Sequence, residues 1–402
     1  MNPCRVLLLA DESADWIVAG LRQLDRLALA IDEYAVDNNE TAPIVVCIFW
    51  RPDLDESQRW IPGNPRLTKV AFTQDIDTQP YDLVLTTRLF PYRKGVRSLF
   101  SEGRASARPI SSDDALPKSG DVQKHVPPSE KESWENYRRA AESLPPSAQG
   151  AWEYITAGEQ IDRIEKKFLR ASGKSQDGFV SRYLNRPISR AITRLLLRFP
   201  ATPDAWTWLI FPIPVIGSLV LSHGTYSSFV WGLVLFQIFS ILDGCDGEIA
   251  RAKFMESERG RKLDDLFDVL SNILLVLGLG FGLRQAHPRF GWLYLVEGIV
   301  AGVLVAINEW YLATRKPAPA GEATADSLGG ALYPRHRDLV ERSGLLRFGE
   351  KFASLLIQLT KRDVAVLFFV FLAAIGLPSL ILHLLFVVTA ASLGLALKAR
   401  LL

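Results

Sequence analysis

The pattern of hydrophobic and polar positions divides the chain into two parts. Up to about residue 200, short apolar runs alternate with polar and charged stretches, whereas the remainder carries long apolar segments. The runs at 6–10 and 44–50 have the length of buried strands, and segment 19–34 between them has apolar residues at helical spacing. Weaker strand candidates follow at 69–72 and 83–86. This alternation of strands and helices predicts an α/β sheet in the first part.

The α/β pattern ends in a polar stretch and then in charged helix. Residues 101–133 are rich in Ser, Pro, Asp and Lys and have no apolar periodicity, which predicts a disordered insert. From 134 to 171 the pattern becomes helical and charged. We therefore predict a soluble α/β domain over residues 1–175 with a disordered insert at about 101–133.

A basic amphipathic helix is predicted over residues 178–200, directly before the apolar half. Asn185 can cap this helix and Pro187 suits its first turn. Arginines recur at every fourth position and apolar residues occupy another face: Arg182, Arg186, Arg190, Arg194 and Arg198, against Ile188, Ile192, Leu195 and Phe199. This pattern favours a juxtamembrane helix on an anionic cytosolic leaflet. The alternative is a charged helix packed on the soluble domain.

The apolar half predicts an all-α membrane domain over residues 201–402. Several of its segments are shorter than the ~20 residues of a full span, but they are long enough for tilted crossings. The six segments are 205–222, 226–242, 265–283, 291–313, 363–376 and 378–397.

The distribution of basic residues predicts the orientation of these spans. Loop 315–362 holds nine Lys and Arg residues, and loop 243–263 holds five more, whereas the loops on the opposite side offer only Arg284 and Arg289. The positive-inside bias therefore places both termini and both basic loops in the cytosol of a bacterial-type cytoplasmic membrane.

The composition excludes some classes of protein. The formal net charge of the 402 residues is only +2, which does not suggest a nucleic-acid partner. The three cysteines, Cys4, Cys47 and Cys245, are too far apart to suggest a disulfide framework or a zinc site. The apolar run at 6–10 is too short for a signal peptide and is followed at once by acidic residues.

Four aspartates carry the most specific chemical signal. Asp243 and Asp246 are three residues apart, and Asp264 and Asp268 are four apart, so each pair shares a helix face. The short loop between the second and third spans makes these helices antiparallel neighbours, so both pairs can face one polar cavity. Crowded carboxylates at a membrane boundary need a counter-charge, and Mg²⁺ or Mn²⁺ prefers oxygen ligands.

Small residues accompany the aspartates. Gly247, Ala250 and Gly260 let a ligand or a neighbouring helix approach the backbone closely. Together with Arg251 they complete the pattern D-x2-D-G-x2-A-R-x8-G-x3-D-x3-D. This pattern resembles the signature of the CDP-alcohol phosphotransferase family, with every fixed position present, and the resemblance covers residues of about 178–400.

The resemblance implies a role for each matched residue. Asp243, Asp246 and Asp264 would be ligands of a two-metal site, and Asp268 would be both a metal contact and the general base for the acceptor hydroxyl. Asp246, Gly247, Ala250 and Gly260 would line the nucleotide, and Arg251 would face the diphosphate or brace the aspartates. The implied reaction transfers a substituted phosphate from a CDP-alcohol, such as CDP-diacylglycerol, to an alcohol or alcohol-phosphate acceptor and releases CMP, as in phospholipid biosynthesis. The family also tends to form homodimers.

One position departs from the family pattern. Many members have Thr-Pro-Asn before the first span, and this chain has Thr202-Pro203-Asp204. An acid therefore replaces an amide close to where the nucleotide would lie, which leaves a cytidine contact by Asp204 in doubt.

The soluble half resembles the sugar-nucleotidyltransferase-like domain of fused members, which include bifunctional inositol-phosphate cytidylyltransferase/transferases. An active domain needs a glycine-rich basic loop after its first strand to cradle a triphosphate. Here the segment 11–15 has no glycine and three acids, and Arg88 stands where a metal-binding aspartate is expected. We predict a degenerate domain with a structural or regulatory role. The alternative is a bifunctional enzyme with an active cytidylyltransferase half.

Other charged residues are weaker candidates. Arg259, Arg261 and Arg315, with Lys316, are possible acceptor-phosphate contacts or ordinary positive-inside anchors. Glu297, Glu309 (beside Asn308) and His383 lie in or near predicted spans, where charged groups are functional candidates or pair with a neighbouring span. A transporter would place its charges near the midplane, and a non-catalytic membrane scaffold would be favoured only if an aspartate of the motif were missing.

Overall fold

The computed structural model describes residues 4–40, 42–76, 81–92, 95–106, 129–142, 150–171, 179–313 and 362–401. The chain forms two compact units. The first comprises Met1–Ser172 with Ala252–Phe254, and the second comprises Gly173–Arg251 and Met255–Leu402.

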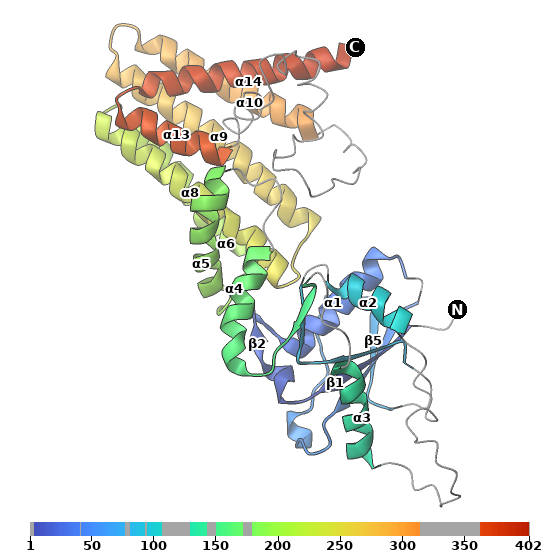
Figure 1. Ribbon diagram of the computed structural model, residues 1–402. Helices are drawn as coiled ribbons and strands as arrows, with labels where there is room; N and C mark the ends of the chain where they lie inside the picture. Colours follow the sequence, from blue (N-terminus) through green and yellow to red (C-terminus); the bar gives the residue numbers. More distant parts are fainter. Residues whose placement is uncertain are drawn as a thin grey trace, which may run out of the picture. The chain divides into compact units, whose positions relative to one another are not determined.

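The first unit is built on a parallel sheet of four strands in the order β5-β4-β1-β6 (Figure 1). The register pairs Val6 of β1 with Val46 of β4 on one side and with Leu83 of β6 on the other. The bounds are β1 (Arg5–Ala10), β4 (Ile44–Trp50), β5 (Val70–Thr73) and β6 (Leu83–Thr86). The α/β prediction and the positions of these four strands are confirmed.

Helices cover both faces of this sheet, as a parallel sheet requires. Val6 and Leu8 pack in one hydrophobic cluster with residues of α1 (Gln23–Asp37) and α2 (Gly95–Ser106). Leu7 and Leu9 point to the other face, where they pack with Trp134 of α3 (Glu130–Glu142). Because successive strand residues alternate between faces, the apolar run of β1 is buried on both sides.

The predicted insert at about 101–133 was partly wrong. Helix α2 extends to Ser106 and α3 begins at Glu130, so both ends of this stretch are helical, and residues 107–128 lie outside the described ranges. The helical prediction for 134–171 is interrupted by β8 (Trp152–Tyr154), which pairs with β7 (Leu89–Pro91) before α4 (Ile161–Ala171). A second small ladder joins β2 (Ile17–Val18) and β3 (Leu21–Arg22). These short strands carry too few residues to show a period in the sequence.

The second unit is helical. It begins with a π-helical turn (Ser181–Asn185) and α5 (Arg186–Leu196). The apolar helices that follow are α6 (Pro203–Ile210), α7 (Pro212–Leu221), α8 (Tyr226–Ala252), α9 (Glu258–Ala286), α10 (Gly291–Ala313), α13 (Arg362–Ala374) and α14 (Pro378–Leu401). Helices α9, α10 and α14 lie side by side (Figure 1).

Four helical segments of the described residues are long and apolar enough to cross a membrane: Pro203–Leu221, Tyr226–Ala252, Glu258–Ala286 and Gly291–Asn308. They indicate an integral membrane protein. The last two predicted segments appear as shorter apolar helices, Asp363–Ala374 and Pro378–Gly394.

Several glycines of this unit lie where two helix backbones approach closely. A Cβ on Gly282 of α9 would lie 2.1 Å from the carbonyl oxygen of Leu221 in α7. A Cβ on Gly280 would lie 3.0 Å from the carbonyl oxygen of Tyr294 in α10. Small residues thus let the backbones of α7, α9 and α10 approach one another, as is common between membrane helices.

Candidate metal and nucleotide site

The aspartates of the motif lie on two consecutive helices. Asp243 and Asp246 belong to α8, which continues to Ala252 beyond the apolar segment predicted for it. Asp264 and Asp268 belong to the first turns of α9, whose N-terminus is capped by Ser257 through a 3.0 Å hydrogen bond from the Gly260 amide. Both helices therefore extend past their predicted apolar stretches. Asp243, Asp246 and Asp264 lie on these extensions, whereas Asp268 lies within the predicted segment 265–283.

Three of the four carboxylates come together. Ligand oxygens of Asp243, Asp246 and Asp264 all lie within 4.8 Å of one another, with Asp246 buried and the other two half-buried. At that separation and an effective dielectric constant of about 20, two unit charges repel by roughly 3–4 kcal/mol. The cluster is therefore unfavourable without a counter-charge.

The donor set fits a hard divalent cation. On one octahedral Mg²⁺, with metal–oxygen distances of about 2.1 Å, ligand oxygens lie at most about 4.2 Å apart. The observed limit of 4.8 Å is close to this value. Asp268 is not part of this group of three; it lies half-buried one turn further along α9, where Ser271 donates a 2.9 Å hydrogen bond to its backbone carbonyl.

A fourth group reaches the cluster from α6 and was missed by the sequence reasoning. The hydroxyl of Thr207 donates to Oδ2 of Asp246 at 2.9 Å. Trp206 docks α6 on α8 through a 2.9 Å hydrogen bond to the carbonyl of Leu242. Thr202 caps the N-terminus of α6. Positions 204 and 207 are three residues apart and therefore share a face of this helix. This spacing was the signal in the sequence that could have identified Thr207.

The small residues of the motif have close neighbours. A Cβ on Gly247 would lie 3.1 Å from a guanidinium nitrogen of Arg251, which is only 8% exposed and folds back along α8. A Cβ on Gly260 would lie 3.2 Å from the carboxylate of Asp204. The acid that departs from the family pattern therefore lies beside a glycine expected to line the nucleotide. Ala250 is buried on α8.

The weaker candidates divide into several groups. Arg259 is exposed, and Arg261 is held by ion pairs of 2.9 Å to both Glu258 and Asp265 on its own helix. Glu297 of α10 contacts His383 of α14 at 2.7 Å, which joins two helices. Arg315 and Lys316 lie outside the described residues, as does the side chain of Glu309.

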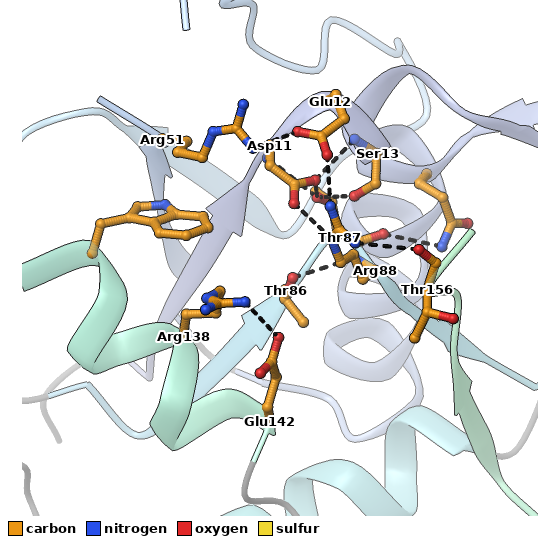
Figure 2. A network of polar contacts seen from close by, with 12 residues as sticks. Asp11, Glu12, Ser13, Arg51, Thr86, Thr87, Arg88, Arg138, Glu142 and Thr156 are labelled. Carbon is orange, nitrogen blue, oxygen red and sulfur yellow. Dashed lines mark hydrogen bonds and ion pairs between the residues drawn. The ribbon is translucent and has the colours of Figure 1, made fainter. Parts of the chain in front are cut away.

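In the first unit, the carboxyl edge of the sheet holds a separate polar network. Ligands of open α/β sheets bind at this edge, where neighbouring strands are connected in opposite directions. Figure 2 shows Asp11 and Glu12, at the end of β1, facing Arg88 and Arg51. Arg88 contacts both acids at 2.6 Å, and Arg51 contacts Glu12 at 2.7 Å. The edge is therefore occupied by ion pairs of the chain itself.

Asp11 is the buried member of this network, with only 3% of its surface exposed. Burial alone would raise the pKa of its carboxyl, but hydrogen bonds from Ser13 and Arg88 outweigh burial and lower that pKa below the ordinary value of 3.8. Two of the three acids of segment 11–15, Asp11 and Glu12, are thus neutralised internally.

Comparison with known proteins finds one matching family model and several curated relatives. Residues 202–389 match the family model described as "CDP-alcohol phosphatidyltransferase". A curated protein of Thermococcus kodakarensis, named "Bifunctional IPC transferase and DIPP synthase", is 37% identical over 118 residues, which are 29% of this chain and 26% of the relative. A protein of the same name from Rubrobacter xylanophilus is 36% identical over 159 residues, 38% of this chain and 36% of the relative. One from Aquifex aeolicus is 32% identical over 145 residues, 36% of this chain and 32% of the relative. The match spans little more than a third of these relatives at most.

Proposed function

Because residues 202–389 carry a CDP-alcohol phosphatidyltransferase domain, we propose that the protein transfers a substituted phosphate from a CDP-alcohol to an acceptor alcohol and releases CMP. The observation that carries the proposal is the convergence of Asp243, Asp246 and Asp264. The donor is CDP-diacylglycerol or a similar compound, and the acceptor is an alcohol or alcohol phosphate. The enzyme works in the membrane, as a homodimer, with its site and both termini in the cytosol.

The three converging carboxylates would hold Mg²⁺ or Mn²⁺. When bound, the metal neutralises charge on the diphosphate and on the departing CMP. Thr207 fixes one oxygen of Asp246, so that the carboxylate enters the site in one orientation. Arg251 lies beside Gly247, where it would face the diphosphate or brace the aspartates.

The chemistry left to the chain is proton removal. The acceptor oxygen forms a bond to the phosphorus next to the alcohol of the donor, and the bond from that phosphorus to the CMP oxygen breaks. The hydroxyl proton goes to the carboxylate of Asp268. Its position on α9, one turn after Asp264, supports this role, because both side chains project from the same face.

The test is CMP release by the purified protein in detergent. A panel of CDP-alcohol donors and acceptors would be assayed with Mg²⁺, Mn²⁺ or EDTA. We expect metal-dependent release that is abolished in Asp268→Asn while metal binding partly survives. Asp265→Asn is the matched control, because this neighbour is exposed and paired with Arg261. Unchanged activity in Asp268→Asn would refute its role as the base.

The relatives are named bifunctional, which favours the alternative of a bifunctional enzyme with an active cytidylyltransferase half. The ion pairs of Arg88 and Arg51 with Glu12 argue against it, because both cations are already engaged where a triphosphate would need them. We therefore expect no pyrophosphate release from CTP and inositol phosphate. Such release, persisting in Asp268→Asn, would establish a second active site.

A further inference from the structure

Helix α8 has a second buried face besides the one that carries the aspartates. This face consists of Gln237, which precedes the family pattern, and of three positions that the pattern leaves open: Gly244, Cys245 and Glu248. Cys245 is fully buried and Glu248 is 2% exposed. An acid this deeply buried is costly unless it is paired and hydrogen-bonded. The residues that pair with Glu248 therefore indicate the structural role of this face of α8.

Within the described part of the chain, the side chains that hold Glu248 come from α5. Arg186 contacts one carboxylate oxygen at 3.2 Å, and Ser189 donates to the same oxygen at 2.9 Å. The hydroxyl of Thr193 donates to the other oxygen at 2.7 Å. Positions 186, 189 and 193 are spaced three and four apart, so they form one stripe along α5. Both oxygens of Glu248 are thus satisfied by one neighbouring helix.

Two further hydrogen bonds join the same face of α8 to α5 and to the residue that precedes it. The amide of Gln237 donates to Oδ1 of Asn185 at 3.0 Å, and the thiol of Cys245 points to the carbonyl of Ser189 at 3.5 Å. Asn185 therefore does not cap α5, as the sequence had suggested, but holds α8. Arg186 is buried as well, so this arginine of the predicted basic face is not available to lipid.

Gly244 shows how closely Arg186 approaches α8. The guanidinium of Arg186 donates to the carbonyl of Gly244 at 3.4 Å, and a Cβ on this glycine would lie 2.8 Å from that same nitrogen. Gly244 stands directly between the metal-binding positions Asp243 and Asp246. The ion pair therefore holds α8 at the level of its metal ligands and from the opposite side.

We propose that Glu248 is a positioning residue. Held by Arg186, Ser189 and Thr193, it fixes the rotation of α8 and thereby sets Asp243 and Asp246 against Asp264. The inference rests on the proposed function of these aspartates. With side chains at a radius of about 5–6 Å, a rotation of about 10° moves a carboxylate by about 1 Å. A displacement of that size can cost about a hundredfold in rate.

The experiment separates positioning from mere support of the fold. Wild type, Glu248→Ala, Glu248→Gln and the apolar pair Arg186→Met with Glu248→Leu are purified in detergent. Each is measured for thermal midpoint, for Mn²⁺ affinity by electron paramagnetic resonance, and for kcat and KM of CMP release. Glu256→Gln, an exposed acid of the following loop, is the matched control.

We expect Glu248→Ala to lower kcat and Mn²⁺ affinity by about 10- to 100-fold, as loss of a supporting group does at other metal sites, with little change in KM. Glu248→Gln, which keeps the shape and one acceptor oxygen, should lie between Ala and wild type. The apolar pair should recover the thermal midpoint, since such replacements are often neutral or stabilising, but not Mn²⁺ affinity or kcat.

Wild-type Mn²⁺ affinity and kcat in the apolar pair would overturn the proposal, since the polar contacts would then only support the fold. Glu248→Ala with unchanged Mn²⁺ affinity would overturn it equally. If wild type releases no CMP with any substrate pair, the proposed function fails, but the Mn²⁺ affinities still decide whether Glu248 positions the aspartates.

Discussion

The repulsion among Asp243, Asp246 and Asp264 predicts that removing one of these charges stabilises the metal-free protein. Asp264→Asn removes one charge and with it both repulsions that involve this side chain, each roughly 3–4 kcal/mol at a dielectric constant of about 20. Partial exposure and salt screening reduce the net effect. In EDTA we therefore expect the variant to be more stable than wild type, by about 1–3 kcal/mol, although the substitution removes a proposed functional group.

Divalent metal should reverse this order. A ligand present at 100 times its Kd stabilises the folded state by about 2.7 kcal/mol. Wild type should gain this amount in Mg²⁺, whereas the variant, with two of the three carboxylates left, should gain much less. The measurement is the thermal midpoint in detergent, followed by the fluorescence of the ten tryptophans, with EDTA or Mg²⁺.

Asp265→Asn is the control for this experiment. Its side chain is 63% exposed and paired with Arg261 on the same helix. It should keep the full Mg²⁺-dependent shift and gain nothing in EDTA. Our reasoning fails if Asp264→Asn keeps the whole Mg²⁺ shift, or if it is no more stable than wild type when metal is removed.

Two further predictions concern helix packing and pH. Gly282→Ala should destabilise the membrane unit by roughly 1–3 kcal/mol or more, because its Cβ would meet the Leu221 carbonyl at 2.1 Å; Gly394→Ala, with nothing within 4 Å, should leave the thermal midpoint in detergent unchanged or slightly raised. Because the pKa of Asp11 is lowered on folding, its contribution to stability is present above pH of about 4 and is lost as pH falls through the lowered pKa. Hydrogen exchange of β1, corrected for its intrinsic pH dependence, should lose this acid sensitivity in Asp11→Asn. A pH response equal to that of wild type would contradict the assignment to the pair with Arg88.

Much of the architecture was predictable because it depends on local periodicity. The strands at 44–50 and 83–86 have the predicted bounds. In each, the buried strand begins and ends where the apolar run meets its polar flanks. The acids of the candidate metal site were similarly visible, because the spacings 243–246 and 264–268 place each pair on one helix face whatever surrounds it. By contrast, β7 and β8 are each three residues long and are far apart in sequence, so only tertiary pairing reveals them.

The sequence by itself determined the division into an α/β half and an apolar half, the four strands of the sheet and the helical spacing of the aspartates, because each follows from residue type and spacing along one element. Tertiary structure alone decided the partner of each polar group. Arg186 belongs to a regular basic stripe, yet it is buried against Glu248. Glu12 belongs to an acidic run, yet it lies between Arg51 and Arg88. The packing of elements that are distant in sequence decides whether a charged side chain is solvated or paired. The local sequence pattern around that side chain does not contain this information.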